Sequence, residues 1–232
     1  MEQNLSKKTR TESDLIGSRE VPESALYGVQ TLRGIENFRI SKFHLNEYPL
    51  FIQALAITKM GATVANRELD LLTEEQADAI LRACKEILEG KHHEQFPVDM
   101  IQGGAGTTTN MNANEVIANR ALELMGHARG EYQYCSPNDH VNRSQSTNDA
   151  YPTAIHIGLY YTHLKLVKHF ATLIEAFRKK GAEFAHIIKM GRTQLEDAVP
   201  MTLGQTFNGF ASILEHELKN LDFAAQDFLT VN

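Results

Sequence analysis

The apolar residues of this chain recur at the spacing of α-helices over most of its length. Two long stretches, residues 153–190 and residues 203–232, carry an apolar residue about every three to four positions. This period places the apolar side chains on one face of a helix. No segment reads as a convincing β-strand, so the pattern predicts a mainly α protein. Shorter segments of the same helical kind cover residues 27–37, 50–69 and 73–90 and a region that starts near Asn112.

Local signals mark some helix ends and the segments between helices. Thr73 and Gln76 have the spacing of a capping box, in which each side chain bonds the backbone N–H of the other residue. Gly90 stands after the last apolar position of that segment, where glycine commonly ends a helix. We expect residues 1–12 to form a loose tail and residues 191–197 to form a polar loop.

The two long segments predict an antiparallel helical hairpin. Such a hairpin leaves much of two apolar stripes uncovered, and helices of this kind normally belong to a bundle of four or more, in one chain or several. We therefore expect that the chain associates through these helices and that it is part of a longer natural domain.

Composition limits the classes of function. The 232 residues suffice for one large domain or two small ones, and a net charge of −6 argues against a general nucleic-acid-binding surface. This charge is compatible with a small anionic substrate in a local pocket. Cys84 and Cys135 form no Cys-x-x-Cys pair, which favours a reduced, cytoplasmic protein. The N-terminal segment lacks an apolar core and no run of about 20 apolar residues occurs, so we expect neither a signal peptide nor a membrane span.

Neutral polar residues gather between Ser136 and Pro152. Residues 144–148 read Ser-Gln-Ser-Thr-Asn, just before the helical pattern that opens at Thr153. At a helix N-terminus, such donors and the helix dipole favour a bound anion. The same residue types are also common in N-caps and turns, so this stretch alone supports both interpretations.

Two other polar segments have a similar character, one around Thr107 and one at Thr193 and Gln194. If the three segments meet, their neutral donors would suit a reaction that builds negative charge on a substrate carboxylate. Zinc-ligand spacing, a complete nucleotide-binding loop and a Gly-x-Ser-x-Gly elbow are all absent from the sequence, so we expect no metal site. The side chains that we expect on helix faces or at helix interfaces, rather than as ligands, are His156, His163, His169, Glu115, Glu215 and Glu217.

Several long, ordered motifs carry a resemblance to a known family. The chain contains Gly-Ser-Arg-Glu-Val-Pro at residues 17–22, Gly-Ala-Gly-Thr at 104–107, Pro-Asn-Asp-His-Val-Asn at 137–142, Gln-Ser-Thr-Asn-Asp at 145–149 and Gly-Arg-Thr-Gln at 191–194. With these motifs the sequence resembles, over nearly its whole length, the N-terminal half of the aspartate ammonia-lyases in the aspartase/fumarase superfamily. The resemblance implies a small N-terminal helical domain, residues 1–148, followed at residues 149–232 by the first two helices of a long central helical bundle.

The resemblance also implies a function. The full-length protein would eliminate ammonia from L-aspartate to give fumarate, without an organic cofactor. Active sites in this family combine loops from three subunits of a homotetramer, which implies a homo-oligomer. The residues that would bind this small dicarboxylate substrate are Thr107, Ser146, Thr147, Asn148, Thr193 and Gln194.

The base of the family is not among these residues. It is a serine on a mobile Gly-Ser-Ser loop that continues into a Pro-x-Lys-x-Asn segment, which follows residue 232 in the family order. No such motif occurs here, since Ser18 follows Gly17 but leads into Arg19. We therefore expect this chain to be inactive by itself.

Two other interpretations stay open. Class II fumarases resemble this chain but usually carry Ser, Ser and His where it has Ala105, Thr147 and Gln194, which favours aspartate over malate. A non-catalytic helical scaffold of the same fold is the second alternative. Its polar loops would then be relics of an anion-binding site.

Overall fold

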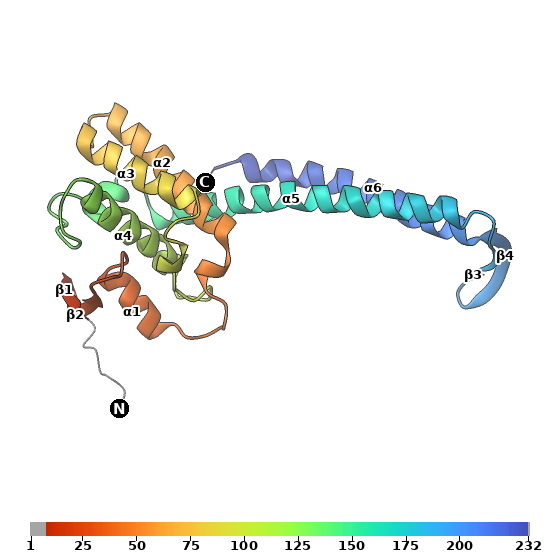
Figure 1. The fold of residues 1–232 in the computed structure, drawn as a ribbon, viewed down its shortest axis with the longest axis horizontal. Helices are drawn as coiled ribbons and strands as arrows, with labels where there is room; N and C mark the ends of the chain where they lie inside the picture. The colour runs from red at the N-terminus through yellow and green to blue at the C-terminus, as the bar shows by residue number, and fades with distance from the viewer. Residues whose placement is uncertain (1–7, 232) are drawn as a thin grey trace. The chain divides into compact units, whose positions relative to one another are not determined.

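The computed structural model describes residues 8–231, and this part of the chain is built mainly from α-helices, as predicted (Figure 1). The helices are α1 (Val29–Asn37), α2 (Pro49–Glu68), α3 (Glu74–Leu88), α4 (Thr107–Leu124), α5 (Thr147–Glu183) and α6 (Leu203–Ala225). The strands are β1 (Thr9–Asp14), β2 (Gly17–Pro22), β3 (Ile188–Thr193) and β4 (Glu196–Thr202). Short helical turns are η1 (Leu45–Glu47), η2 (His93–Gln95), η3 (Pro137–Val141) and η4 (Gln226–Leu229).

The chain forms two compact units. The first comprises the described residues up to Gly158 together with Val231, and the second comprises Leu159–Thr230. Helix α5 begins in the first unit and continues into the second. The family-based boundary at residue 148 stays a prediction.

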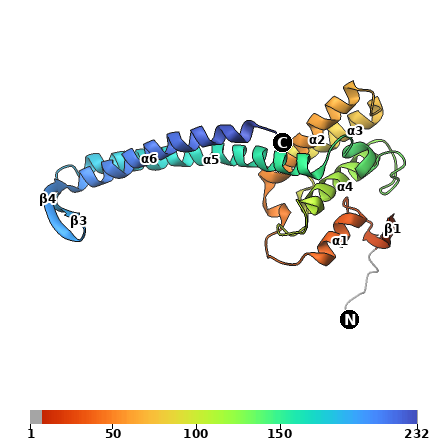
Figure 2. The same cartoon turned by 180° about the vertical axis from the view of Figure 1, so that it is seen from behind.

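Helix α4 is the centre of the first unit. It packs against α1, α2, α3 and η3, and every residue from Thr109 to Asn119 is buried. Helices α2 and α3 lie side by side next to it (Figure 1, Figure 2). Burial of their apolar faces is the main favourable contribution to folding of this unit. The core side chains, each at most 1% exposed, include Leu45, Ile52, Leu55, Ile80, Ile87, Phe96, Ile117 and Leu122.

Polar side chains are also buried along α4. The carboxylate of Glu115 is 1% exposed and accepts hydrogen bonds of 2.5–3.0 Å from the backbone N–H groups of Gly28, Gln30 and Thr31 and from the Thr31 hydroxyl. It thereby satisfies the start of α1, whose N-cap residue Gly28 has no side chain to do so. The prediction that Glu115 is an ordinary helix-face carboxylate is wrong, because the sequence does not reveal what covers that face.

Most predicted helices exist, but two of them begin earlier than expected. The capping box of Thr73 and Gln76 is confirmed. Helix α4 begins at Thr107 rather than near Asn112, because Gly106 adopts a left-handed φ of 85° that turns the chain directly into the helix. Helix α5 begins at Thr147, so Pro152 lies inside it and Thr153 does not open it. Pro152 lacks a backbone N–H, so the helix loses one i→i−4 hydrogen bond at this position.

Within the second unit, α5 and α6 run antiparallel and pack together, as predicted (Figure 1, Figure 2). Nε2 of His163 lies 2.8 Å from Oδ1 of Asp222, and the Arg178 guanidinium pairs with the Glu215 carboxylate at 2.7 Å. From the first of these pairs to the second, the residue number rises along α5 and falls along α6, so the two helices run in opposite directions. An aromatic cluster between the two helices consists of Phe177, Phe184, Phe207 and Phe210.

The segment between these helices is a β-hairpin, so the prediction of a polar loop at residues 191–197 is wrong. Strands β3 and β4 pair from Ile188↔Thr202 to Thr193↔Glu196. Helix α5 accordingly ends at Glu183 instead of Met190. Strands of six and seven residues with a bulge carry too little regular alternation to be recognised from hydrophobicity.

A second hairpin lies near the N-terminus. Strand β1 pairs with β2 from Thr9↔Pro22 to Asp14↔Gly17, so residues 9–12 are not part of a loose tail, and residues 1–7 lie outside the described part. The Arg10 guanidinium fixes this hairpin, since it donates to the carbonyls of Pro22, Ala25 and Tyr27 at 2.8–3.0 Å. A long-range side-chain contact of this kind leaves no trace in local periodicity.

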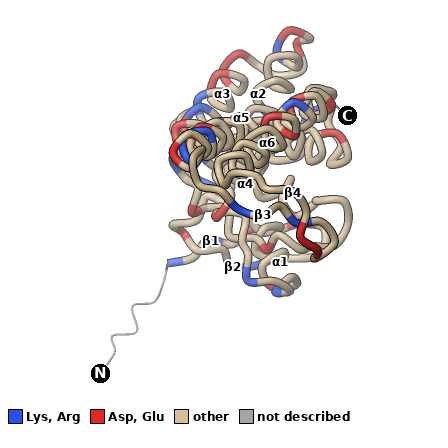
Figure 3. Tube along the Cα trace, turned by 90° about the vertical axis from the view of Figure 1, so that its right-hand side faces the viewer, with Lys and Arg blue, Asp and Glu red and all other residues tan. Residues whose placement is uncertain are grey.

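Helix α3 carries charges of both signs, with Glu74 and Glu75 in its first turn and Lys85 in its last, an order that suits the helix dipole. Figure 3 marks the charged residues of both signs along the chain. The helices present in residues 8–231 are too short or too polar to cross a bilayer. Helix α6 ends at Ala225 and is followed by the short turn η4, so the expected α-helix does not continue past Ala225.

Large apolar side chains remain exposed on the two long helices, including Leu159, Leu164, Leu166, Leu173, Phe210, Ile213 and Phe223.

Candidate functional site

The run of neutral polar residues forms the start of helix α5. The Oγ of Ser146 accepts the backbone N–H of Asn148 at 3.2 Å, and the N–H of Ser146 donates to the Asp149 carboxylate at 2.9 Å. The Ser146 side chain therefore caps the start of the helix, so the N-cap interpretation of the stretch is confirmed. The positive end of the helix dipole coincides with Ser146, Thr147 and Asn148, which keeps the anion-binding interpretation open.

A buried lysine stands behind this turn. Lys59 of α2 is 0% exposed, and its Nζ donates to Oδ1 of Asn110 at 2.8 Å, Oδ1 of Asn142 at 2.9 Å and Oε1 of Gln145 at 3.0 Å. Three acceptors match the three N–H bonds of an ammonium group. Asn110 also donates to Oγ1 of Thr147 at 3.3 Å. The lysine thus ties α2 and α4 to the segment that leads into α5.

The surroundings of Lys59 oppose its positive charge. Burial lowers the pKa of Lys59 from 10.5 to about 7. The neighbouring thiol of Cys84 supplies no compensating charge at neutral pH, because burial raises its pKa to about 12. Neutral amide oxygens are therefore the main partners of this ammonium group. The free energy lost by removing the charge from water is larger than the free energy gained from these three hydrogen bonds, which is why the pKa falls.

The start of α4 lies beside the start of α5. A cavity of about 630 Å³ is lined by the Gly-rich turn that precedes Thr107 and by the first turns of α5, including Asn148. The structure therefore brings four predicted substrate-binding residues, Thr107 and Ser146–Asn148, to two neighbouring helix N-termini of the first unit. The lining of this cavity consists of Met100, Ile101, Gln102, Gly104, Ala105, Gly106, Asn148, Tyr151, Pro152 and Ile155.

The other two predicted residues, Thr193 and Gln194, belong to the second unit. Thr193 ends β3 and Gln194 opens the turn to β4, in which Gln194 and Leu195 have φ angles of 47° and 72°. Two such residues in succession suit a tight hairpin turn, but each costs a non-glycine residue about 1 kcal/mol or more. Strain of this kind is common where a turn has a functional role.

His163 of α5 lies in the second unit, away from these clusters. His163 is 8% exposed and lies at the α5–α6 interface, as expected, with Nε2 bonded to Asp222. Its Nδ1 is buried without a hydrogen-bond partner among the described residues. Residues 8–231 contain no cluster of three or more His, Cys, Asp or Glu side chains arranged to hold a metal ion.

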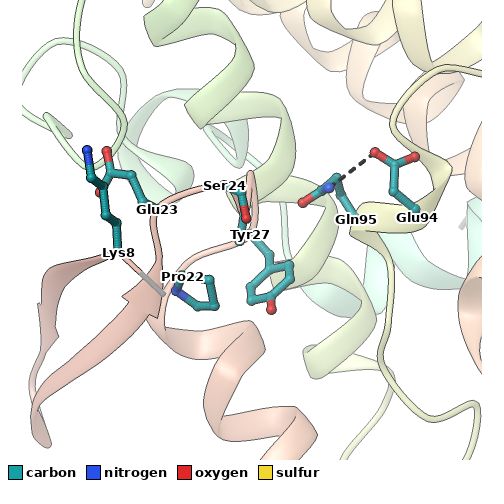
Figure 4. A pocket seen from close by; sticks show the side chains of 8 residues that line it. Lys8, Pro22, Glu23, Ser24, Tyr27, Glu94 and Gln95 are labelled. Atoms are coloured by element: carbon teal, nitrogen blue, oxygen red, sulfur yellow. Dashed lines mark hydrogen bonds between the residues drawn. The ribbon is translucent and has the colours of Figure 1, made fainter. Parts of the chain in front are cut away.

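A second cavity, of about 650 Å³, lies between the end of β2 and η2 in the first unit. Figure 4 shows Lys8 and Glu23 on one side of it, Glu94 and Gln95 on the other, and the Tyr27 ring between them. Nε2 of Gln95 donates to the Glu94 carboxylate at 3.1 Å. Charges of both signs line this cavity and no predicted site residue reaches it, so it is not the candidate site.

Comparison with known proteins places the chain in a family. The family model described as "Lyase" matches residues 17–231. The chain is 58% identical to an aspartate ammonia-lyase of Pseudomonas fluorescens over 221 residues, which cover 95% of this chain and 46% of that protein. The chain therefore belongs to this lyase family.

Solved structures agree with this placement. A fumarate lyase:delta crystallin from Brucella melitensis is similar with a TM-score of 0.94 and 51% identity, over 97% of this chain and 52% of that one. A recombinant class II fumarase from Schistosoma mansoni is similar with a TM-score of 0.88 and 34% identity, over 97% of this chain and 47% of that one. The chain thus spans about half the length of the relatives that it matches.

Two important residues of the site region were missed from the sequence. Lys59 stands within an otherwise apolar and small-residue face of α2, and a lone lysine on such a face is a usable signal for a buried, partnered ammonium. Tyr151 lines the cavity beside Asn148, yet nothing in its local sequence separates it from a core aromatic residue.

The buried ammonium predicts a pH-dependent stability. The pKa of Lys59 is lower in the folded chain (about 7) than its ordinary value of 10.5, so between these pH values the unfolded chain binds more protons. The free energy of unfolding should therefore rise with pH in this window, by up to about 1.4 kcal/mol per pH unit, and the Lys59→Met variant should lack this rise. Urea unfolding at several pH values between 6.5 and 10 measures it.

The matched control is Lys85→Met, which removes an exposed lysine from α3 and should keep the wild-type pH dependence. Parallel curves for the wild type and Lys59→Met would show that Lys59 keeps an ordinary pKa in the folded chain.

Proposed function

We propose that this chain supplies the N-terminal half of an enzyme that eliminates ammonia from L-aspartate to give fumarate. The observation that carries the proposal is the 58% identity to an aspartate ammonia-lyase across 95% of the chain. The family placement and the two neighbouring helix N-termini with hydroxyl and amide side chains support it.

The proposed chemistry makes use of neutral donors. Removal of a proton from Cβ of aspartate places a second negative charge on the adjacent carboxylate, and expulsion of the amino group as ammonia then forms the double bond. Side-chain donors of Ser146, Thr147 and Asn148 would stabilise the developing charge, each by on the order of 3 kcal/mol. Thr107 would bind from the neighbouring helix start, and Thr193 and Gln194 from the β3–β4 turn.

Lys59 supports this arrangement without being assigned contact with substrate. Its hydrogen bonds to Asn110 and Gln145 hold the residues that flank the Ser146 turn. Preorganised donors are effective because they need no rearrangement as charge develops. The proposed binding group is therefore built on rigid helices of the first unit.

A second candidate is malate dehydration, as in class II fumarases. The similarity to the Schistosoma mansoni fumarase, with a TM-score of 0.88, favours it at the level of fold. Its identity of 34% is well below the 58% of the aspartate ammonia-lyase. Ala105, Thr147 and Gln194 also stand where fumarases usually carry other residues, so we favour aspartate.

We further propose that the protein works in the cytoplasm as a homo-oligomer. The free, buried thiols of Cys84 and Cys135 suit a reducing compartment. Exposed apolar side chains along α5 and α6, such as Leu173 at 45% and Ile213 at 60%, suit burial against other helices of a tetrameric bundle.

The substrate assignment is tested with the full-length protein, meaning a chain of the relatives' length that contains residues 1–232. We expect steady formation of fumarate from L-aspartate and none above background from L-malate. Absorbance of fumarate in the ultraviolet follows both reactions. Preferred turnover of malate would reassign the protein to the fumarases, and turnover of neither would favour the non-catalytic scaffold.

Association through the long helices is tested on the 232-residue chain. We expect a light-scattering mass above the 26.0 kDa of one copy, and we expect Ile213→Glu to reduce it because the variant places a charge on the exposed apolar stripe. Lys219→Glu, at an exposed polar position of the same helix, is the control. A constant mass of one copy across a wide concentration range would contradict this prediction.

The 232-residue chain by itself should not release fumarate at a meaningful rate. Its proposed residues bind the substrate but do not remove the Cβ proton, and a positioned base typically contributes about 10²–10⁴-fold. The measurement is fumarate absorbance with excess aspartate, beside the full-length protein. Comparable turnover would place a base within these 232 residues.

A further inference from the structure

The cavity beside Asn148 has walls from two different helix starts. The turn of Gly104–Gly106 forms one wall, and Tyr151 and Pro152 of α5 form part of the other. Substrate-binding residues flank it on both sides in the proposed function, with Thr107 after the turn and Asn148 before Tyr151. Its width therefore depends on whatever holds the turn away from α5.

The Tyr151 ring is in direct contact with the turn. A Cβ added to Gly106 would overlap Cγ, Cδ1 and Cδ2 of this ring, so the ring lies against the glycine Cα with no room for a methyl group. Gly106 also has a φ of 85°. Two independent constraints, the backbone conformation and the ring, thus require glycine at this position.

The ring has a firm support on its other side. The Phe51 ring of α2 meets Tyr151 edge to face, with centroids 5.7 Å apart. Phe51 is followed directly by Ile52, which is 0% exposed in the core. The α2 backbone approaches α5 at Gly158, where an added Cβ would lie 3.5 Å from Cα of Phe51. The Tyr151 ring therefore packs between Phe51 of α2 on one side and the Gly-rich turn on the other.

We propose that Tyr151 is a positioning residue for the proposed substrate pocket, since its ring sets the spacing between the turn before Thr107 and the Ser146–Asn148 turn. This inference rests on the proposed function. The contact atoms are those of the ring and not the hydroxyl, so phenylalanine should replace tyrosine. Loss of the ring should let the turn move, and a misplacement of about 1 Å in an active site can cost about 100-fold in rate.

The test uses the full-length protein and four variants. Tyr151→Phe should keep kcat/KM for aspartate within about threefold, whereas Tyr151→Ala and Gly106→Ala should each lower it by roughly 100-fold. Gly126→Ala is the matched control for Gly106→Ala: Gly126 has a φ of 84° at the other end of α4, and an added Cβ meets nothing within 4 Å. It should lower Tm by only about 1–2 °C in a protein of this length and leave kcat/KM unchanged.

A double variant isolates the contact itself. Gly106→Ala should lower Tm well beyond Gly126→Ala, and adding Tyr151→Ala should recover part of that loss, because the methyl group then has room. This coupling separates ring contact from simple loss of stability. The coupling is obtained from Tm values alone, so it can be measured even if a single variant has too little folded protein for kinetics.

The possible results lead to different conclusions. Equal losses of kcat/KM in Tyr151→Phe and Tyr151→Ala would overturn the inference, because they would assign the role to the hydroxyl. Gly106→Ala that behaves like Gly126→Ala would overturn it too, because the ring would then not set the spacing. If the wild type forms no fumarate from aspartate, the proposed function fails, while the Tm coupling still reports whether Tyr151 holds the turn.

Discussion

The contact between the Lys59 ammonium and three amide oxygens is the interaction on which the site region depends. It joins α2 to Asn110 of α4 and to Asn142 and Gln145, which lie in the segment that leads into α5. A buried ammonium is costly unless every N–H is satisfied, so the three acceptors must keep their places. That requirement fixes the turn at residues 142–145, in which Ser144 holds a left-handed φ of 59° that costs a non-glycine residue about 1 kcal/mol or more.

Other buried polar side chains of α4 also bond to distant parts of the chain. Asn119 bonds the carbonyl of Leu26 and the N–H of Gly130, and Asn112 bonds the carbonyl of Gln95. The Glu115 carboxylate accepts hydrogen bonds from the backbone N–H groups at the start of α1. A buried polar group is stable only when its hydrogen bonds are made. The polar side chains of α4 therefore favour the one arrangement of the surrounding loops that provides their partners. Apolar packing alone would hold these irregular segments less specifically.

Function and stability meet at the starts of α4 and α5. Ser146 caps α5 and is also a proposed substrate-binding residue, and Gly106 starts α4 while its Cα supports the Tyr151 ring. A helix N-terminus combines a fixed backbone with a favourable field for negative charge, which suits a dicarboxylate substrate. At this place the fold of the first unit itself orients the proposed binding groups Thr107 and Ser146–Asn148.

The sequence by itself determined the helical class, the long antiparallel pair and the capping box at Thr73, because hydrophobic period and capping chemistry are local properties. Its motifs also indicated the family and the residues Ser146–Asn148. Only the tertiary structure decided that Lys59 is buried, that Glu115 caps another helix and that Tyr151 lies on Gly106. These contacts join residues 45–87 positions apart, and no local pattern specifies which partner a buried charge or ring will meet.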